Sequence, residues 1–204
     1  MNSSSSDEYL TIKRLVRLKT KVEGSIFIAS AIPVDSEEEA KEWILKISSE
    51  FFDATHSCFA CRIKKAQDES IKFSDAGEPR GTAGKPILSA IESENLYNVV
   101  VVVTRYFGGV KLGTGGLSRA YRQSAQSALQ RAEKVTRWIT SEITLSYPLN
   151  MTGKVNQIFS KYGIRAKDQG FENKPTAKIE VRVGLLQKVK KALVEATNGQ
   201  VRFK

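Results

Sequence analysis

A run of β-branched residues passes directly into a glycine-rich loop in the segment VVVVVTRYFGGVKLGTGG, residues 99–116. Five valines followed by a threonine are typical of a strand that is buried on both faces. The free N–H groups of such a loop can hold an anion where a helix begins. Glycines that serve only tight turns are the alternative explanation. The segment therefore predicts a buried strand of an α/β domain, followed by a candidate binding loop.

A second glycine-rich segment, FSDAGEPRGTAGK, spans residues 73–85. Neither segment fits a P-loop. In the segment 99–116 the glycine spacing runs from Gly108 to Gly113, but Thr114 stands where the lysine of that motif belongs. We expect the two segments to meet as rims of one site, with Asp75 and Glu78 orienting Arg105 through charge-assisted bonds. The N-terminus of a helix after Gly116 would then be free for an anion. On this hypothesis the Arg105→Ala variant should have a melting temperature close to that of the wild type and should lose partner binding.

The candidate anion- or partner-binding residues all belong to these loops or directly follow them. They are Asp75, Glu78, Arg105, Tyr106, Phe107, Gly108, Gly109, Lys111, Gly115, Gly116 and Arg119. A surface ion pair among them is the alternative explanation, and it would contribute at most about 1 kcal/mol.

The remaining pattern of the first half predicts a mixed α/β domain. Ser36, followed by Glu39 three residues later, is a capping box that predicts the start of a helix. The predicted strands cover residues 9–19, 25–32, 57–64 and 99–104. The predicted helices cover residues 36–49, 85–94 and 117–133.

The second half predicts the order βαββαβ, which is a ferredoxin-like split motif. Strict alternation from Ala177 to Val183 indicates a half-buried strand, and Gly163 is placed as a helix C-cap. The predicted strands cover residues 143–147, 164–171, 177–183 and 201–203, and the predicted helices cover 155–162 and 186–198. If both helices cover one side of the sheet, the open side holds five basic residues: Arg165, Lys167, Lys178, Arg182 and Arg202. A solvated or docked sheet face is the alternative to RNA binding.

Charge is distributed unevenly along the 204 residues, whose net charge is +10. Residues 137–204 hold 13 Lys and Arg against 5 Asp and Glu, a net of +8, whereas residues 1–136 have a net of +2. Clustered cations attract phosphates at long range, so we expect a polyanionic partner such as RNA. A bias that only improves solubility is the alternative. Aromatic residues are missing from the five basic positions, which predicts phosphate contacts of low sequence specificity.

Composition excludes several classes of protein. The longest apolar run is far shorter than a membrane span needs, so no membrane partner is expected. Residues 1–8 are predicted to be a disordered lead-in. Two cysteines are too few for a disulfide framework, and this agrees with a cytoplasmic location. His56, Cys58 and Cys61 lack a fourth ligand and the spacing of a zinc site, and the two cysteines would face opposite sides of a strand. We therefore expect neither a metal nor a cofactor, and we expect His56 to fix a neighbouring loop by hydrogen bonding.

The sequences DATHSCFA at 53–60, the loop at 75–85 and RYFGGVKLGTGGL at 105–117 together resemble the signature of the IMPACT/YigZ family. The resemblance covers nearly the whole chain, as in the two-domain microbial members. Two positions depart from the family pattern. Arg80 replaces a small residue, and Cys61 replaces an aromatic one. The first departure could alter the ligand or partner of the loop.

The resemblance implies an α+β protein of two domains. Residues 9–136 would form an N-terminal domain with the left-handed βαβ fold of ribosomal proteins and of elongation factor G domain IV. Residues 137–204 would form a ferredoxin-like domain similar to domain V of that factor. The eukaryotic relatives are regulators of translation under amino-acid stress, which act through protein–protein competition.

Three functional hypotheses follow. The first is a translation-associated regulator that binds the ribosome, RNA or a translation-regulatory protein without catalysis. The second is an enzyme that acts on a small phosphorylated substrate bound at the glycine-rich loops, with Asp75 or Glu78 as a base. The third is an adaptor that binds only protein. Fold resemblance alone does not decide among them.

Overall fold

A computed structural model describes residues 7–65, 68–171 and 174–204. The chain divides into two compact units. The N-terminal unit is Tyr9–Arg137, and the C-terminal unit is Trp138–Lys204 together with Asp7 and Glu8. Among the residues that the structure describes, none of the helices combines the length and the apolarity that a membrane crossing requires.

The N-terminal unit is built on a five-stranded sheet in the order β2-β3-β6-β4-β5, with every neighbouring pair antiparallel. Its strands are β2 (Val16–Val22), β3 (Ser25–Pro33), β4 (His56–Lys64), β5 (Glu69–Ser74) and β6 (Val99–Tyr106). A separate two-stranded sheet pairs β1 (Glu8–Ile12) with β7 (Lys134–Trp138). The helices are α1 (Glu37–Glu50), α2 (Gly84–Ser93) and α3 (Gly113–Arg131).

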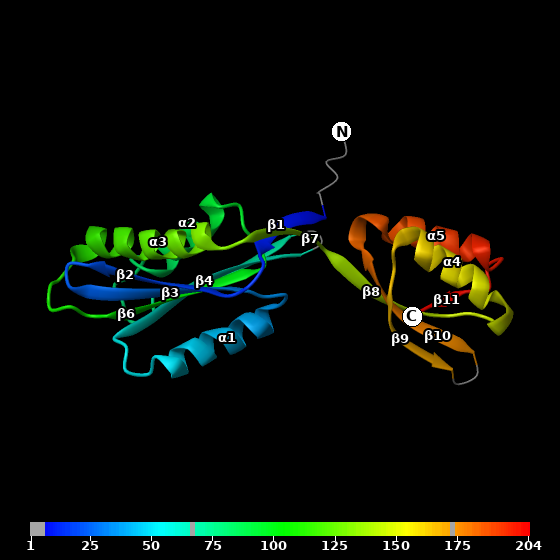
Figure 1. Cartoon of the computed structure of the whole chain (residues 1–204), viewed down its shortest axis with the longest axis horizontal. Coiled ribbons are helices and arrows are strands. Elements are labelled where there is room, and N and C mark those ends of the chain that lie inside the picture. Colours follow the sequence, from blue (N-terminus) through cyan, green and yellow to red (C-terminus); the bar gives the residue numbers. More distant parts are fainter. Residues whose placement is uncertain (1–6, 66–67, 172–173) are drawn as a thin grey trace. The chain divides into compact units, whose positions relative to one another are not determined.

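Strand β6 lies at the centre of the five-stranded sheet, which explains its run of valines. Helix α1 covers one face of the sheet, and α2 and α3 cover the other (Figure 1). Val100 and Val102 pack with α1, whereas Val99, Val101 and Val103 pack with α2 and α3. The valines of this strand are fully buried, so the prediction of a strand covered on both faces is confirmed.

Local signals placed the ends of several elements correctly. The hydroxyl of Ser36 accepts a hydrogen bond from the N–H of Glu39 at 3.1 Å, which confirms the N-cap. Two predictions were wrong. The single strand predicted over 9–19 is two strands, β1 and β2, and α3 begins at Gly113 rather than near Leu117. The helix therefore includes most of the glycines that were expected to form its preceding loop.

The C-terminal unit has the predicted βαββαβ order. Its strands are β8 (Thr140–Ser146), β9 (Ala166–Phe171), β10 (Pro175–Arg182) and β11 (Arg202–Phe203), and its helices are α4 (Thr152–Tyr162) and α5 (Leu186–Ala196). Short 3-10 turns, η1 (Leu149–Met151) and η2 (Val183–Leu185), precede the two helices. The strand order β11-β8-β10-β9 is that of a ferredoxin-like sheet, so this prediction is confirmed.

Both helices of this unit pack on the same face of the sheet. Val155 and Phe159 of α4 and Val189 and Leu193 of α5 share one core with Ile179 of β10 (Figure 1). Gly163 ends α4 in the left-handed conformation with φ 63°, as predicted for a C-cap. The opposite face of the sheet is therefore not covered by a helix of this unit.

Residues 1–6 of the expected lead-in lie outside the described residues, as does Asn173, which stands between the strands predicted over 164–171 and 177–183. Asp7 and Glu8 are part of the fold. Glu8 begins β1, and the carbonyl oxygen of Asp7 accepts a hydrogen bond from the N–H of Ile139 at 2.7 Å. The carboxylate of Asp7 also accepts a hydrogen bond from the N–H of Gly184 at 3.0 Å.

Candidate functional site

Asp75 organises the loop between β5 and α2. One carboxylate oxygen accepts from the N–H of Gly81 at 2.7 Å, and the other accepts from Ala83 at 2.9 Å and Gly84 at 2.8 Å. Burial opposes ionisation of this carboxyl, but the three donors outweigh it and lower its pKa. Asp75 therefore anchors the start of α2, and the expectation that it orients Arg105 was wrong.

Glu78 and Arg105 form the centre of a buried polar cluster. The Nη1 of Arg105 lies 2.7 Å from the Oε1 of Glu78, and the side chains are 7% and 3% exposed, respectively. Tyr121 of α3 donates its hydroxyl proton to the same carboxylate oxygen at 2.8 Å. The Nη2 of Arg105 donates to the hydroxyl of Ser25 at 3.3 Å. The cluster thus ties together a loop, two strands and a helix.

This geometry confirms the expected contact of Glu78 with Arg105 and corrects its setting. We expected Arg105→Ala to change the melting temperature little, and a surface ion pair was the alternative explanation. The pair is buried, and the Nε of Arg105 has no hydrogen-bond partner within the described residues. The guanidinium carbon also lies 5.6 Å from the ring centroids of Phe27 and Phe107. Loss of Arg105 would therefore leave a buried carboxylate without its counter-charge.

The potential nucleophiles near the cluster are committed to structural contacts. Burial raises the pKa of the Cys58 thiol to about 12, and the thiol donates to the carbonyl oxygen of Asp75 at 2.9 Å. The Nδ1 of His56 lies 2.9 Å from the carbonyl oxygen of Ala76, which confirms that His56 fixes a neighbouring loop. Cys61 faces the other side of the sheet, as predicted.

A resident metal finds no ligand set here. In the stretches 7–65, 68–171 and 174–204, no three His, Cys, Asp or Glu side chains come together in a way that could hold an ion.

The loop after β6 is fixed tightly at its first glycine. A Cβ on Gly108 would lie 1.9 Å from the carbonyl carbon of Gly24, so only glycine fits. The N–H of Gly108 donates to the hydroxyl of Ser25 at 3.2 Å, and that of Phe107 donates to the hydroxyl of Thr55 at 3.1 Å. Gly108 is therefore required by the close approach of the Gly24 backbone and not by a positive φ. A Cβ on Gly109 would meet nothing within 4 Å, but Gly109 adopts φ 87°, so the turn alternative applies to this glycine.

Beyond Gly109 the loop borders a hollow of about 430 Å³. Its lining residues come from the β2–β3 turn, from the loop and from the first turns of α3: Val22, Glu23, Val110, Lys111, Leu112, Gly116, Arg119, Ala120 and Gln123. Lys111 and Arg119 are exposed, and no carboxylate lies within ion-pair distance of them in the described part of the chain. Phe107 and Val110 are each 49% exposed.

We call Phe107, Val110, Lys111 and Arg119 the outer rim. The predicted loop residues thus separate into two groups. Glu78 and Arg105 are buried in the inner cluster, whereas the outer rim holds two free cations and two apolar side chains. Tyr106 belongs to neither group, because its hydroxyl donates to Asp53 at 2.7 Å.

Sequence reasoning missed the role of Tyr121 in the inner cluster. Its hydrogen bond to Glu78 spans 43 residues of chain, so no local pattern indicates this contact. A lone phenol among the inward-facing alanines of α3 was the one signal, since a buried Tyr hydroxyl needs a partner.

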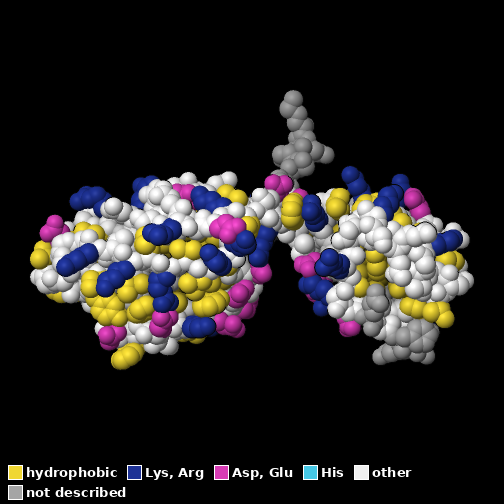
Figure 2. All heavy atoms as spheres, in the orientation of Figure 1, with side chains coloured by type: hydrophobic (Ala, Val, Ile, Leu, Met, Phe, Trp, Pro, Cys, Tyr) yellow, Lys and Arg dark blue, Asp and Glu magenta, His cyan; other side chains and the backbone are white. Residues whose placement is uncertain are grey.

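The open sheet face of the C-terminal unit is less basic than predicted. Lys167 lies 2.8 Å from Glu142 and 3.0 Å from Glu180, and Lys178 lies 2.8 Å from Glu142. Hydrogen bonds from these two lysines lower the pKa of Glu142 to about 2. Blue and magenta side chains are accordingly intermixed on this unit in Figure 2. Two of the five expected cations are thus held by carboxylates of their own sheet.

The other three cations differ from one another. Arg202 donates to the carbonyl oxygen of Gly199 at 2.9 Å. The guanidinium of Arg182 lies 3.6 Å from the ring centroid of Trp138, so an aromatic residue does accompany this surface. Arg165 is exposed and precedes β9 rather than lying in it. Arg165 and Arg182 have no carboxylate partner among the described residues.

Comparisons with known proteins agree across sequence and structure. The Impact N-terminal domain family model matches residues 23–129. An IMPACT family member from Haemophilus influenzae is 35% identical over 95% of this chain and 95% of its own length. The IMPACT family member YvyE from Bacillus subtilis is 40% identical over 72% of this chain and 67% of its length. A crystal structure of a hypothetical protein is similar with a TM-score of 0.74 and 25% identity, covering 96% of each chain.

Proposed function

The chain belongs to the IMPACT family, and we propose that it is a translation-associated regulatory protein that binds RNA of the ribosome rather than a catalyst. The outer rim would be the contact surface of the N-terminal unit. The positively charged C-terminal unit would add a second contact to the same polyanion.

The observation that carries this proposal is the division between the inner cluster and the outer rim. An enzyme of phosphorylated substrates would need a free base or nucleophile beside its anion site. Here Asp75 is held by three N–H groups, Glu78 by Arg105 and Tyr121, and Cys58 is a buried thiol of raised pKa. Among the predicted loop residues discussed above, the side chains that remain available to a partner are those of the outer rim.

The chemistry of the outer rim favours a phosphate-bearing macromolecule. Lys111 and Arg119 line one hollow together with the exposed Glu23, but neither cation is ion-paired among the described residues, so a phosphate would meet them without breaking an ion pair. The first N–H groups of α3, which begins at Gly113, lie in the same region and favour negative charge. Phe107 and Val110 add an exposed apolar surface of the kind found in interfaces.

Co-sedimentation with purified ribosomes at low and at high salt tests this function. We expect the full chain to sediment with ribosomes at low salt and to be released at high salt, because released counterions dominate phosphate binding. Stabilisation by a sugar phosphate or nucleotide without ribosome binding would favour the enzyme instead. If neither occurs and a specific protein is co-purified, the chain is an adaptor and the proposal fails.

A further inference from the structure

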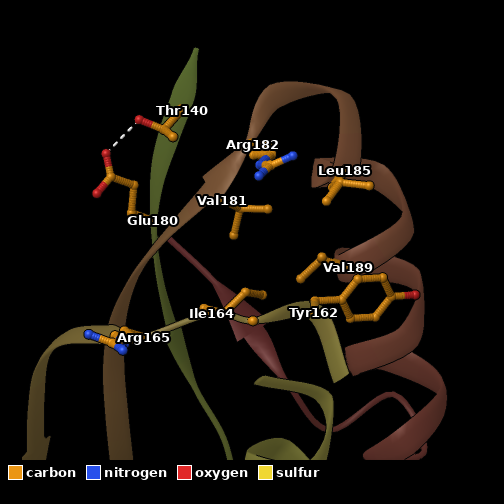
Figure 3. A pocket seen from close by; sticks show the side chains of 10 residues that line it. Thr140, Tyr162, Ile164, Arg165, Glu180, Val181, Arg182, Leu185 and Val189 are labelled. Carbon is orange, nitrogen blue, oxygen red and sulfur yellow. Dashed lines mark hydrogen bonds between the residues drawn. The ribbon is translucent and has the colours of Figure 1, made fainter. Parts of the chain in front are cut away.

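A hollow of about 530 Å³ opens beside the sheet of the C-terminal unit, within the size range of small-ligand sites. Figure 3 shows side chains from β8, α4, β10 and α5 around it. Its lining is formed by Thr140, Tyr162, Gly163, Ile164, Arg165, Glu180, Val181, Arg182, Leu185 and Val189. It is separate from the outer rim, which belongs to the other unit.

The hollow exists because β9 stops short of the end of β10. The pairing of the two strands shifts register between Lys178 and Ile179 and ends at Ile179, opposite Ala166. Ile164 is held back at the end of α4, where its N–H donates to the carbonyl oxygen of Phe159 at 2.8 Å. The last residues of β10, including Val181, therefore have no neighbouring strand on this side.

The floor of the hollow is apolar, and its rim is cationic. Ile164, Val181, Leu185 and Val189 turn toward the open space in Figure 3, with the ring of Tyr162 beside them. Arg165 and Arg182 lie at the rim. The one acidic residue of the lining, Glu180, accepts a hydrogen bond from Thr140 and pairs with Lys167. The carboxylate is thus occupied, while the two guanidinium groups are not.

Trp138 prepares Arg182 for binding. The guanidinium carbon lies 3.6 Å from the ring centroid of the indole, and a contact with the face of a ring uses none of the five N–H donors. A stacked arginine loses less side-chain freedom when it binds an anion. Lys167 and Lys178, by contrast, would have to leave Glu142 before they could bind a phosphate.

We propose that this hollow binds one nucleotide of single-stranded RNA, with the base against the apolar floor and Tyr162 and the flanking phosphates on Arg165 and Arg182. An apolar floor and unpaired guanidinium groups favour a ligand that combines a negatively charged group with an apolar part. Tyr162 and the stacked Arg182 are planar, as is a base, and bases of single strands are recognised by stacking on aromatic rings and guanidinium planes. The inference rests on the proposed function, because it names the part of the RNA that this unit would hold.

The chain contains two tryptophans, so Trp43→Phe leaves Trp138 as the one fluorescent indole beside Arg182. In that background a short uridine oligonucleotide should change the Trp138 emission with saturation. Arg165→Gln with Arg182→Gln should weaken this binding by about tenfold or more, the scale of one stacking interaction. Lys154→Gln with Lys191→Gln removes the same charge from exposed positions outside the lining and should cost much less.

Two other ligands distinguish the contribution of the base to binding from that of the phosphates. An abasic oligonucleotide of equal charge should bind about tenfold more weakly if the base uses the floor. Equal binding of the abasic and uridine oligomers overturns the proposal, and so does equal weakening by both double variants. A response of Trp138 to an acidic peptide but not to RNA assigns the hollow to a protein and also overturns it. If the protein sediments with ribosomes but the emission of Trp138 does not change with RNA, the proposal for this hollow is rejected and the proposed function stands. If the protein binds neither RNA nor ribosomes, the proposed function is rejected as well.

Discussion

Glu78 and Arg105, which are 27 residues apart in the chain, form an ion pair of 2.7 Å that is almost completely buried. Burial of charged groups is unfavourable unless they are paired and hydrogen-bonded. Tyr121 and Ser25 supply additional hydrogen bonds, and the pair joins the loop after β5 to β6. The pair therefore holds the glycine-rich segments in place and is buried, whereas the outer rim is exposed.

Removal of one member of this pair should be strongly destabilising. We expect Arg105→Ala to lower the free energy of unfolding by about 3–5 kcal/mol, because Glu78 would be left as a buried unpaired charge. Urea denaturation measures this. Lys13→Ala is the matched control: it breaks the exposed pair with Glu133 and should cost at most about 1 kcal/mol. Wild-type stability of Arg105→Ala would show that the pair does not hold the loop.

Gly108→Ala should disrupt the loop after β6, because its Cβ would collide with the backbone of Gly24 at 1.9 Å. Gly115→Ala provides the control within the same segment. It lies inside α3, where the nearest atom is the flexible Nη1 of Arg119 at 3.5 Å, and alanine favours a helix by up to about 1 kcal/mol. In thermal unfolding, the melting temperature of Gly115→Ala should equal or exceed that of the wild type, and the melting temperature of Gly108→Ala should be clearly lower. The reverse order would contradict the described loop.

Asp75 should make stability depend on pH. Because its pKa is lowered in the folded protein, its contribution is present above the unfolded pKa of about 3.9 and is lost as pH falls through the folded pKa. Asp75→Asn should therefore be destabilising near neutral pH, with a difference from wild type that shrinks in acid. Urea denaturation at neutral and acidic pH compares the two. A difference independent of pH would mean that the charge of Asp75 does not hold the loop.

The thiol of Cys58 should react only slowly with thiol-specific reagents in the folded protein. Burial raises the pKa of its thiol to about 12, so almost no thiolate is present near neutral pH. In a Cys61→Ser background, a thiol-specific reagent should label Cys58 slowly in buffer and rapidly in denaturant. Fast labelling of the folded protein would reopen the interpretation of Cys58 as a nucleophile.

Periodicity and capping were sufficient to predict much of the fold. The valines of β6, the N-cap at Ser36 and the C-cap at Gly163 all carry local signals that depend on few neighbours. Strand β5 was missed because it is an edge strand in which no side chain is fully buried, so it shows no clear alternation. The start of α3 was misplaced because glycine has a low helix propensity, yet Gly113–Gly116 are helical here.

The site was harder to predict than the fold. Sequence placed Glu78 near Arg105, but it gave no sign that both are buried, since burial depends on how α3 and β3 pack over them. The same limit applies to the basic sheet face. Alternation predicted its cations, while the carboxylates of Glu142 and Glu180, which pair with Lys167 and Lys178, alternate on the same face and were overlooked.

The salt dependence of RNA binding by outer-rim variants tests the central proposal most directly. Lys111→Gln with Arg119→Gln should weaken binding and reduce the slope of log affinity against log salt by about 0.7–0.9 for each phosphate that the variant no longer neutralises. Arg14→Gln with Lys41→Gln removes equal charge from exposed positions of the same unit and should leave the slope close to wild type. Equal slopes for wild type and both double variants would show that the outer rim does not bind RNA phosphates, which would contradict the proposed function.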